Sequence, residues 1–178
     1  MTEFTFAPLG PAHDRSGFAC GSAALDRYIR ELATQDIRRR VSNCFVAVDA
    51  AGKLAGYYTL AATSLPLLEL APEHVRRLPR YTAFPACLVG RLAVDQAFQE
   101  QGLGGALLVD AMARALRAEP AIFALIVDAK DEAAVRFYLH HGFQRFTSRP
   151  MSLYLPLGEA ARRLDGGPHP GRPGHDVR

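Results

Sequence analysis

A chain of 178 residues is long enough for one well-buried domain and short for two. Hydrophobic residues make up 49% of it and charged residues 22%, ordinary globular values that exclude wholesale disorder. The net charge is only +3, and the N-terminus has no basic segment followed by an apolar run. The longest uncharged stretch, 54–68, is interrupted by a proline and two tyrosines, so we expect no membrane span and a cytoplasmic protein.

The N-terminal half predicts a strand, a helix and a hairpin. Residues 3–9 have the pattern of a short strand, and Ser22 is a suitable N-cap for a helix that ends near residue 40. Two apolar runs on either side of a turn at 49–53 predict a β-hairpin. Residues 66–86 are rich in proline and arginine, and we expect only one helical turn there, at 72–78.

The C-terminal half alternates strands with helices. The apolar run "CLVGRLAVD" at 87–95 predicts a buried strand, followed by a helix at 103–118. A second buried strand at 121–129 leads into a helix with Asp131 as its N-cap and Gly142 as its C-terminal stop. The segments "FQRF" and "MSLYLPL" predict a final pair of strands.

This order of elements predicts a single α/β layered domain over residues 1–158, with a mixed sheet and helices on its faces. From residue 159 to 178 proline and glycine abound and apolar periodicity is lost, so we expect a disordered tail. The three cysteines, Cys20, Cys44 and Cys87, are odd in number and never in a C-x-x-C pair. We therefore expect neither a disulfide framework nor a zinc or other metal site, and we interpret them as small buried apolar residues.

The segment "QEQGLGG" at 99–105 places three glycines at the junction between the predicted strand at 87–95 and the helix predicted to follow it. Unpaired backbone N–H groups converge at such a junction, and the helix dipole favours negative charge, so a pyrophosphate is a natural ligand. The spacing fits neither the G-x-G-x-x-G loop nor a Walker loop. A tight turn without a ligand is the alternative.

The pattern Gln99-x-x-Gly102-x-Gly104 after "RLAVD" resembles the acetyl-coenzyme A motif of the GNAT superfamily of N-acetyltransferases. The resemblance implies the GNAT fold, a mixed and mostly antiparallel central sheet with helices on both faces. It also implies acetyl-coenzyme A as acetyl donor, with phosphate-facing amides in the turn and strand-like pairing of the coenzyme's pantetheine arm. The implied coenzyme contacts are Leu92, Ala93, Val94, Gln99, Gln101, Gly102, Leu103, Gly104, Gly105 and Ala106.

The same resemblance gives a catalytic role to a tyrosine on the helix that runs into Gly-Phe. In "AAVRFYLHHGF" this residue is Tyr138, which would protonate the departing coenzyme thiolate. A core tyrosine with a hydrogen-bonded hydroxyl is the alternative. His140 and His141 follow at once, and we interpret them as helix C-terminal residues favoured by the dipole, not as bases.

The acceptor amine must be neutral to attack, and an α-amine, with a pKa of about 7.7 to 8.0, needs less help than a lysine at about 10.4. Many GNAT relatives carry a glutamate on the strand before the turn, but here no carboxylate precedes Asp95, which sits where it would cap the turn. This absence favours an α-amine substrate.

Six segments together resemble the GNAT toxins of toxin–antitoxin modules, which acetylate the α-amino group of aminoacyl-tRNA. They are "FACGSAALDRYI" at 18–29, "GYYTL" at 56–60, "LPRY" at 78–81, "GRLAVD" at 90–95, "GLGGALLVDA" at 102–111 and "VDAKDEAAVRFYLHHGF" at 127–143. The resemblance implies charged tRNA as substrate, a ribbon-helix-helix antitoxin as partner and a homodimer. A protein or small-molecule amine as acceptor, and a coenzyme-binding module without transferase activity, are the other hypotheses.

Under this resemblance, clustered arginines become candidate tRNA phosphate contacts. They are Arg38, Arg39, Arg40, Arg76, Arg77, Arg80 and Arg91. A plain solvated surface is the alternative for each cluster, and an ion pair with Asp95 or Asp128 is the alternative for Arg91. We place Tyr57, Tyr58 or Phe84 in the pocket for the amino acid side chain, from their positions alone.

Overall fold

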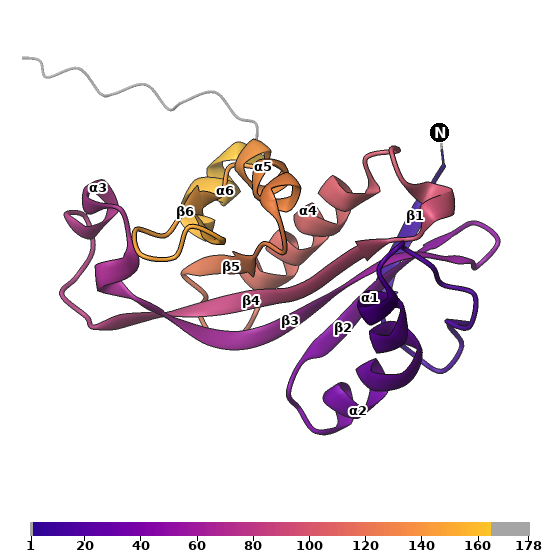
Figure 1. The fold of residues 1–178 in the computed structure, drawn as a ribbon. Coiled ribbons are helices and arrows are strands. Elements are labelled where there is room, and N and C mark those ends of the chain that lie inside the picture. Colours follow the sequence, from indigo (N-terminus) through magenta and orange to yellow (C-terminus); the bar gives the residue numbers. More distant parts are fainter. Residues whose placement is uncertain (1, 165–178) are drawn as a thin grey trace, which may run out of the picture.

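The computed structural model describes residues 2–164, which form a seven-stranded sheet with helices on both faces (Figure 1). The strand order is β1-β2-β3-β4-β5-β7-β6, and every pair of neighbours is antiparallel except β4 and β5. The strands are β1 (Phe4–Pro8), β2 (Asn43–Asp49), β3 (Leu54–Pro66), β4 (Ala83–Val94), β5 (Ala124–Asp128), β6 (Gln144–Arg145) and β7 (Ser152–Pro156). The predicted mixed, mostly antiparallel sheet is confirmed.

One face of the sheet is covered by the N-terminal helices and the other by the C-terminal ones. The helices are α1 (Ala23–Arg27), a π-helical segment η1 (Tyr28–Leu32), α2 (Ala33–Arg38), α3 (Pro72–Val75), α4 (Leu103–Leu116), α5 (Glu132–His140) and α6 (Leu157–Leu164). Short 3-10 turns lie at η2 (Leu67–Glu69) and η3 (Gln96–Phe98). The α1–α2 unit packs on one core cluster, and α4, α5 and α6 share another on the opposite face.

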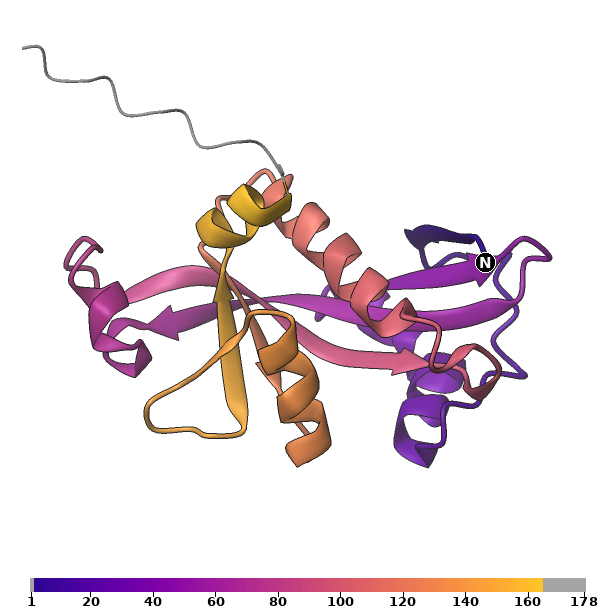
Figure 2. The same cartoon turned by 90° about the horizontal axis from the view of Figure 1, so that it is seen from above.

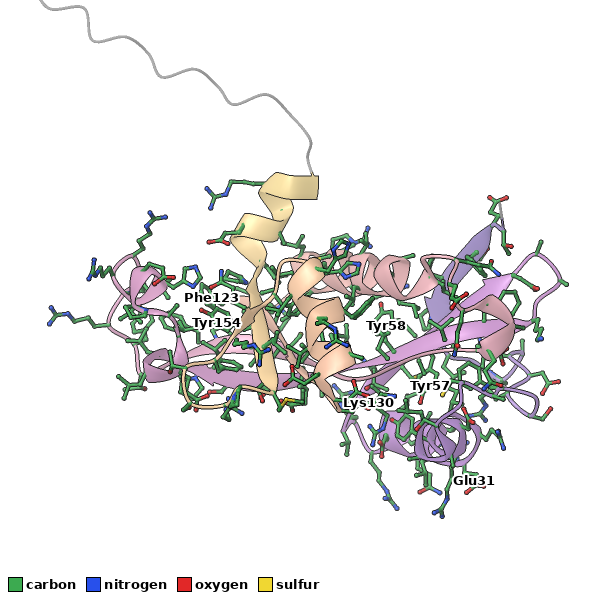
Figure 3. The ribbon with its side chains drawn as sticks, turned by 45° about the horizontal axis from the view of Figure 1, so that its top comes forward. Glu31, Tyr57, Tyr58, Phe123, Lys130 and Tyr154 are labelled. Carbon is green, nitrogen blue, oxygen red and sulfur yellow. The ribbon has the colours of Figure 1, made fainter. Side chains whose placement is uncertain are left out.

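Two adjacent tyrosines on β3 show this division. Successive strand residues point to opposite faces, so Tyr57 lies under α1 and Tyr58 lies under α4 (Figure 3). The Tyr57 hydroxyl donates to the Leu25 carbonyl at 2.8 Å, and the Tyr58 hydroxyl donates to Asp110 at 2.6 Å. Each side chain is fully buried and ties its helix to the sheet.

The α1–α2 unit begins and ends as the sequence predicts. The Ser22 hydroxyl accepts from the Leu25 amide, and Ile29 and Ala33 are fully buried against the sheet. The π-helical segment between α1 and α2 has no sequence signal and was not predicted.

Strand β4 begins at Ala83, four residues before the predicted start at Cys87, because it pairs with the far end of β3 from Pro66 onward. The β3–β4 pair therefore extends well beyond the rest of the sheet and carries α3 at its tip (Figures 1 and 2). Among the described residues no helix is long and apolar enough to cross a membrane.

Two expectations need correction. The tail was expected to lack structure from residue 159, but α6 continues to Leu164 because Leu157 and Ala160 are buried in the core cluster shared with α4. Residues 165–178 of that tail lie outside the described residues. Of the three cysteines only Cys44 is buried, whereas Cys20 and Cys87 are partly exposed.

Candidate active site

The central feature is a gap that opens where β4 leaves β5. Residues 86–89 of β4 pair with residues 124–127 of β5, but from residue 90 onward β4 pairs only with β3. A bulge marks the departure, because Gly90 and Arg91 together stand opposite Thr59, whose hydroxyl accepts from the Arg91 amide at 3.1 Å. Figure 2 shows β4 continuing toward the start of α4 while α5 follows β5.

Alternation along β4 decides which backbone groups face this gap. The Asp95 amide donates to the Ala55 carbonyl on β3, whereas the Val94 carbonyl accepts from the Gln99 side chain on the other side. By the antiparallel pattern, the backbone groups of Leu92 also face the gap and those of Ala93 face Tyr57 on β3. Strand-like contacts are thus available at the Leu92 backbone and the Val94 amide, whereas the Val94 carbonyl already accepts from Gln99 and the Ala93 backbone faces β3.

The glycine turn closes one end of the gap. Gly102 adopts φ 78° as the N-cap of α4, and Glu100 before it adopts φ 61°, so the chain turns sharply through left-handed backbone. The first helical bond runs from the Ala106 amide to the Gly102 carbonyl, and no side chain caps α4. The amides of residues 103–105 therefore have no acceptor among the described residues, and they converge on the positive end of a 14-residue helix.

A hollow of about 390 Å³ lies against this turn. It is lined by Val94, Phe98, Gln99, Glu100, Gly102, Leu103, Gly104, Gly105, Phe137, His140 and His141. The uncapped amides, the left-handed turn and the hollow together fit an anionic ligand such as the pyrophosphate of acetyl-coenzyme A.

The other two glycines pack closely against side chains of α5. A β-carbon at Gly104 would lie 3.3 Å from Phe137 Cζ, and one at Gly105 would lie 2.8 Å from His141 Nε2. Phe137 and His141 line the hollow but were not predicted as site residues. Their spacing of four residues on one helix face, beside Tyr138, was the available signal.

The structure assigns different tasks to the remaining turn residues. Gln99 lines the hollow, and its side-chain amide braces the turn by donating to the Cys20 and Val94 carbonyls, each at 3.0 Å. The Ala106 amide is used inside α4 and is not free for a ligand. Gln101 is exposed at the turn and does not line the hollow.

Asp95 is buried and fully engaged. Its carboxylate accepts from the Ala97 amide at 2.9 Å, which caps η3, and from the Ala19 amide at 3.0 Å. It therefore caps the turn, as expected, and is not placed as a free base. Among the described residues no group of three or more His, Cys, Asp and Glu side chains is arranged to hold a metal ion.

Tyr138 on α5 is 8% exposed, and its hydroxyl makes no hydrogen bond with any described residue. Its ring packs on Phe137 and Phe143, at 5.2 and 5.4 Å between centroids. Burial, and then the charge of Asp128, raises the pKa of Tyr138 to about 12. The alternative of a core tyrosine with a bonded hydroxyl does not describe this residue, whose proton is accepted by no group in the described part of the chain.

The arginine clusters do not form one surface. Arg38, Arg39 and Arg40 lie at the end of α2 and Arg76, Arg77 and Arg80 lie beside α3, and all six are exposed. Figures 1 and 2 place α2 and α3 at opposite ends of the molecule. Within residues 2–164 none of the six belongs to an ion pair.

Arg91 is not paired with a carboxylate as the alternative interpretation supposed. Asp95 bonds backbone amides, and Asp128 accepts from the Ser152 hydroxyl. The Arg91 guanidinium instead lies over the Tyr28 ring, 3.6 Å from its centroid.

The suggested pocket for the amino acid side chain is wrong. Tyr57 and Tyr58 are fully buried with their hydroxyls bonded to helices on opposite faces. Phe84 packs on Phe123 at the base of the tip that carries α3. All three side chains are buried, and alternation along a strand does not reveal what covers each of its faces.

Comparison with known proteins gives a consistent result. A family model described as the acetyltransferase (GNAT) domain matches residues 40–145. A tRNA-acetylating toxin from Mycobacterium tuberculosis (strain ATCC 25618 / H37Rv) is 37% identical over 161 residues, covering 89% of this chain and 94% of that protein.

Two solved structures share the fold. AtaT complexed with acetyl-methionyl-tRNAfMet has a TM-score of 0.82 at 24% identity, covering 91% of this chain and 99% of that one. A mutant AtaT toxin bound to the C-terminus of the antitoxin AtaR and acetyl-CoA has a TM-score of 0.74 at 23% identity, covering 92% and 99%. Because the family match spans more than half of its length, the chain belongs to the GNAT family of acetyl-coenzyme A-dependent N-acetyltransferases.

Proposed function

We propose that the chain transfers the acetyl group of acetyl-coenzyme A to the α-amino group of the amino acid carried by tRNA. The observation that carries the chemistry is the Tyr138 hydroxyl, which is protonated, unpaired and set on the helix that packs against the glycine turn. The substrate class is supported by similarity over 89% of the chain to a protein named as a tRNA-acetylating toxin.

The residues at the gap fit the donor in two places. The uncapped amides of residues 103–105 would hold its pyrophosphate, and the Leu92 backbone and the Val94 amide would pair with its pantetheine arm. Bound this way, the donor supplies an activated acetyl thioester. Gln99, Asp95 and the α5 residues Phe137 and His141 keep the turn in shape for it.

The transfer needs no covalent intermediate on the protein. The amine nitrogen forms a bond to the acetyl carbon, the carbon–sulfur bond breaks, and the departing thiolate takes the Tyr138 proton while the nitrogen releases its own to water. The Leu92 amide, which faces the gap, is the backbone donor placed to stabilise the oxyanion. The Ala93 amide bonds to β3 and does not serve this purpose.

The lack of a free base supports an α-amine acceptor. Asp95, the only carboxylate within residues 87–95, is occupied by two backbone amides. An α-amine is already neutral in a substantial minority of molecules near neutral pH, whereas a lysine amine is not.

We further propose that the chain is the toxin of a toxin–antitoxin pair and blocks translation in the cytoplasm, where charged tRNA is used. The antitoxin would bind the toxin directly, as AtaR does in its complex with AtaT. A ribbon-helix-helix antitoxin and a homodimeric toxin remain predictions from the family resemblance.

The test is transfer of labelled acetyl from acetyl-coenzyme A to a total pool of charged tRNA. A deacylated tRNA pool and a lysine peptide are the controls. We expect label on charged tRNA only, and sorting by isoacceptor then names the amino acid. Label on the peptide alone would contradict the tRNA assignment and favour a protein acceptor.

A further inference from the structure

Arg91 has an unusual environment for an arginine on a central strand. It is half-buried at the bulge where β4 leaves β5, and within the described residues it has no carboxylate partner. Its guanidinium lies flat on the Tyr28 ring. A planar guanidinium stacked in this way is held at little entropic cost, while the N–H groups on its edge stay available to an anion.

Tyr28 is itself fixed from three sides. It is the first residue of η1, a π-helical segment of the kind often found at functional sites. Its hydroxyl donates to Asp36 on α2 at 2.9 Å and lies 3.4 Å from the Ser42 hydroxyl. Burial raises the pKa of the Tyr28 phenol, so the hydroxyl keeps its proton and remains a donor.

These contacts connect Tyr28 to the arginine cluster at the end of α2. Asp36 and Ser42 bracket Arg38, Arg39 and Arg40 in the sequence. In the sheet, Asn43 stands opposite Leu60 and Leu60 stands opposite Val89, two residues before Arg91. The chain leaving α2 therefore enters the sheet at the level of the gap, and its arginines lie on the same side of the sheet as Arg91.

The other arginine cluster is remote from this place. Strand β4 starts at Ala83 beside the tip, eight residues before Arg91, which at about 3.3 Å per residue is roughly 25 Å away. The α3 cluster and Arg91 therefore lie too far apart to contact the same phosphate group.

We propose that Arg38, Arg39, Arg40 and Arg91 form one surface for the phosphates at the acceptor end of charged tRNA, and that Tyr28 is the positioning residue that organises it. This proposal rests on the proposed function. Substrate would approach the gap from the α1–α2 side, while Tyr138 acts from the α5 side. The Arg76, Arg77 and Arg80 cluster is not part of this surface.

The test compares Tyr28→Leu, which removes the ring, with Tyr28→Phe, which keeps the ring and removes the hydroxyl. From the range typical of cation–π contacts, Tyr28→Leu should raise KM for charged tRNA by about 3- to 30-fold. KM for acetyl-coenzyme A and the dissociation constant of coenzyme A should stay unchanged. Tyr28→Phe should keep most of the wild-type KM, and Arg91→Lys should behave like Tyr28→Leu because lysine has the charge but not the plane.

A double-mutant cycle shows whether Tyr28 acts through Arg91. In an Arg91→Ala background, Tyr28→Leu should raise KM for charged tRNA no further. A full additional increase in that background, or an equal rise in KM for both substrates, would overturn the positioning role. If Tyr28→Leu unfolds, Arg91→Lys and Tyr28→Phe still decide the question by their opposite predicted effects.

The proposed function and this inference fail in different ways. A wild-type protein that transfers no acetyl to charged tRNA removes the proposed function before any variant is compared. A wild-type protein that transfers normally, with Arg91→Lys and Tyr28→Leu both at wild-type KM, removes only the surface proposed at Tyr28.

Discussion

The glycine turn and α5 form one region of the molecule, and the two arginine clusters lie elsewhere in it. Local sequence predicts the first, whereas the placement of the clusters depends on the tertiary fold. The turn, the unpaired end of β4 and Tyr138 come from consecutive elements whose local patterns carry their roles. The arginine clusters have similar composition, yet one lies at the end of α2 and the other at the distant tip that carries α3 (Figure 1). Local sequence therefore identifies the turn, but only tertiary placement separates the two arginine clusters.

The largest expected effect is at the catalytic end. Tyr138→Phe should lower kcat by about 10²- to 10⁴-fold, the range typical of a lost general acid. Because the hydroxyl has no hydrogen-bond partner among residues 2–164, the free energy of unfolding and coenzyme binding should stay unchanged. Steady-state kinetics with denaturant unfolding checks both, and unchanged turnover would remove Tyr138 from the mechanism.

The pH dependence sharpens the same assignment. The raised pKa of Tyr138, about 12, keeps the hydroxyl protonated in the free enzyme, and the proton is lost only as pH rises toward that value. Ionisation of Tyr138 should therefore cause no fall in kcat/KM between pH 8 and 10. Over that range the pH profiles of wild type and Tyr138→Phe should have the same shape. A Tyr138-dependent fall in that range would show that the phenol ionises far more easily than its burial predicts.

Next in size is the contrast between the arginine clusters. Each phosphate contact contributes roughly 0.7 to 0.9 to the slope of log affinity against log salt concentration. Replacing residues 38–40 by alanine should therefore flatten this slope for charged tRNA by about 2 to 3. Alanine at residues 76, 77 and 80 should change it by less than about one contact's worth. Filter binding across a salt series measures both triple variants, and the reverse ranking would place the RNA at the α3 tip.

A smaller effect is expected where the turn packs on α5. Gly105→Ala places a β-carbon 2.8 Å from His141 Nε2, so we expect a loss of about 1 to 3 kcal/mol in unfolding free energy and weaker coenzyme binding. Adding His141→Ala should restore part of both. Gly158→Ala on α6 is the matched control, because nothing lies within 4 Å of its β-carbon.

The smallest effect on catalysis is expected at Tyr58, which resembles Tyr138 in burial but not in bonding. Tyr58→Phe removes a hydrogen bond to Asp110 and should cost about 1.5 to 3 kcal/mol of unfolding free energy. Its kcat should remain that of wild type. A large loss of kcat with normal stability would show that the two tyrosines have been assigned the wrong roles.

Much of the fold followed from local signals. The Ser22 and Asp131 caps, the stop at Gly142 and the hairpin turn at 49–53 are confirmed, because each depends on backbone chemistry within a few residues. The early start of β4 and the helical residues 159–164 were not predictable, since pairing with β3 and packing on α4 decide them.

The features of the candidate site also divide into those that the sequence predicted and those that depend on tertiary contacts. The anion site at the turn was predicted from the order strand, glycines, helix, and the role of Tyr138 from the family resemblance, whereas the Gln99 brace and the unavailable Ala93 backbone depend on contacts between distant segments. The Arg91 stack joins residues 63 positions apart in the sequence, and neither residue alone predicts it. Tyr57 and Tyr58 were misplaced because a strand pattern does not say what covers each face.

The central claim is that the acetyl donor lies along the edge of β4 that does not pair with β5. Hydrogen exchange of individual amides, measured with and without coenzyme A, tests it most directly. Binding should slow exchange at Leu92 and Val94, which face the gap, and leave Ala93 unchanged because it already bonds to β3. Exchange at Leu92 and Val94 that is indifferent to saturating coenzyme A would contradict this placement of the donor.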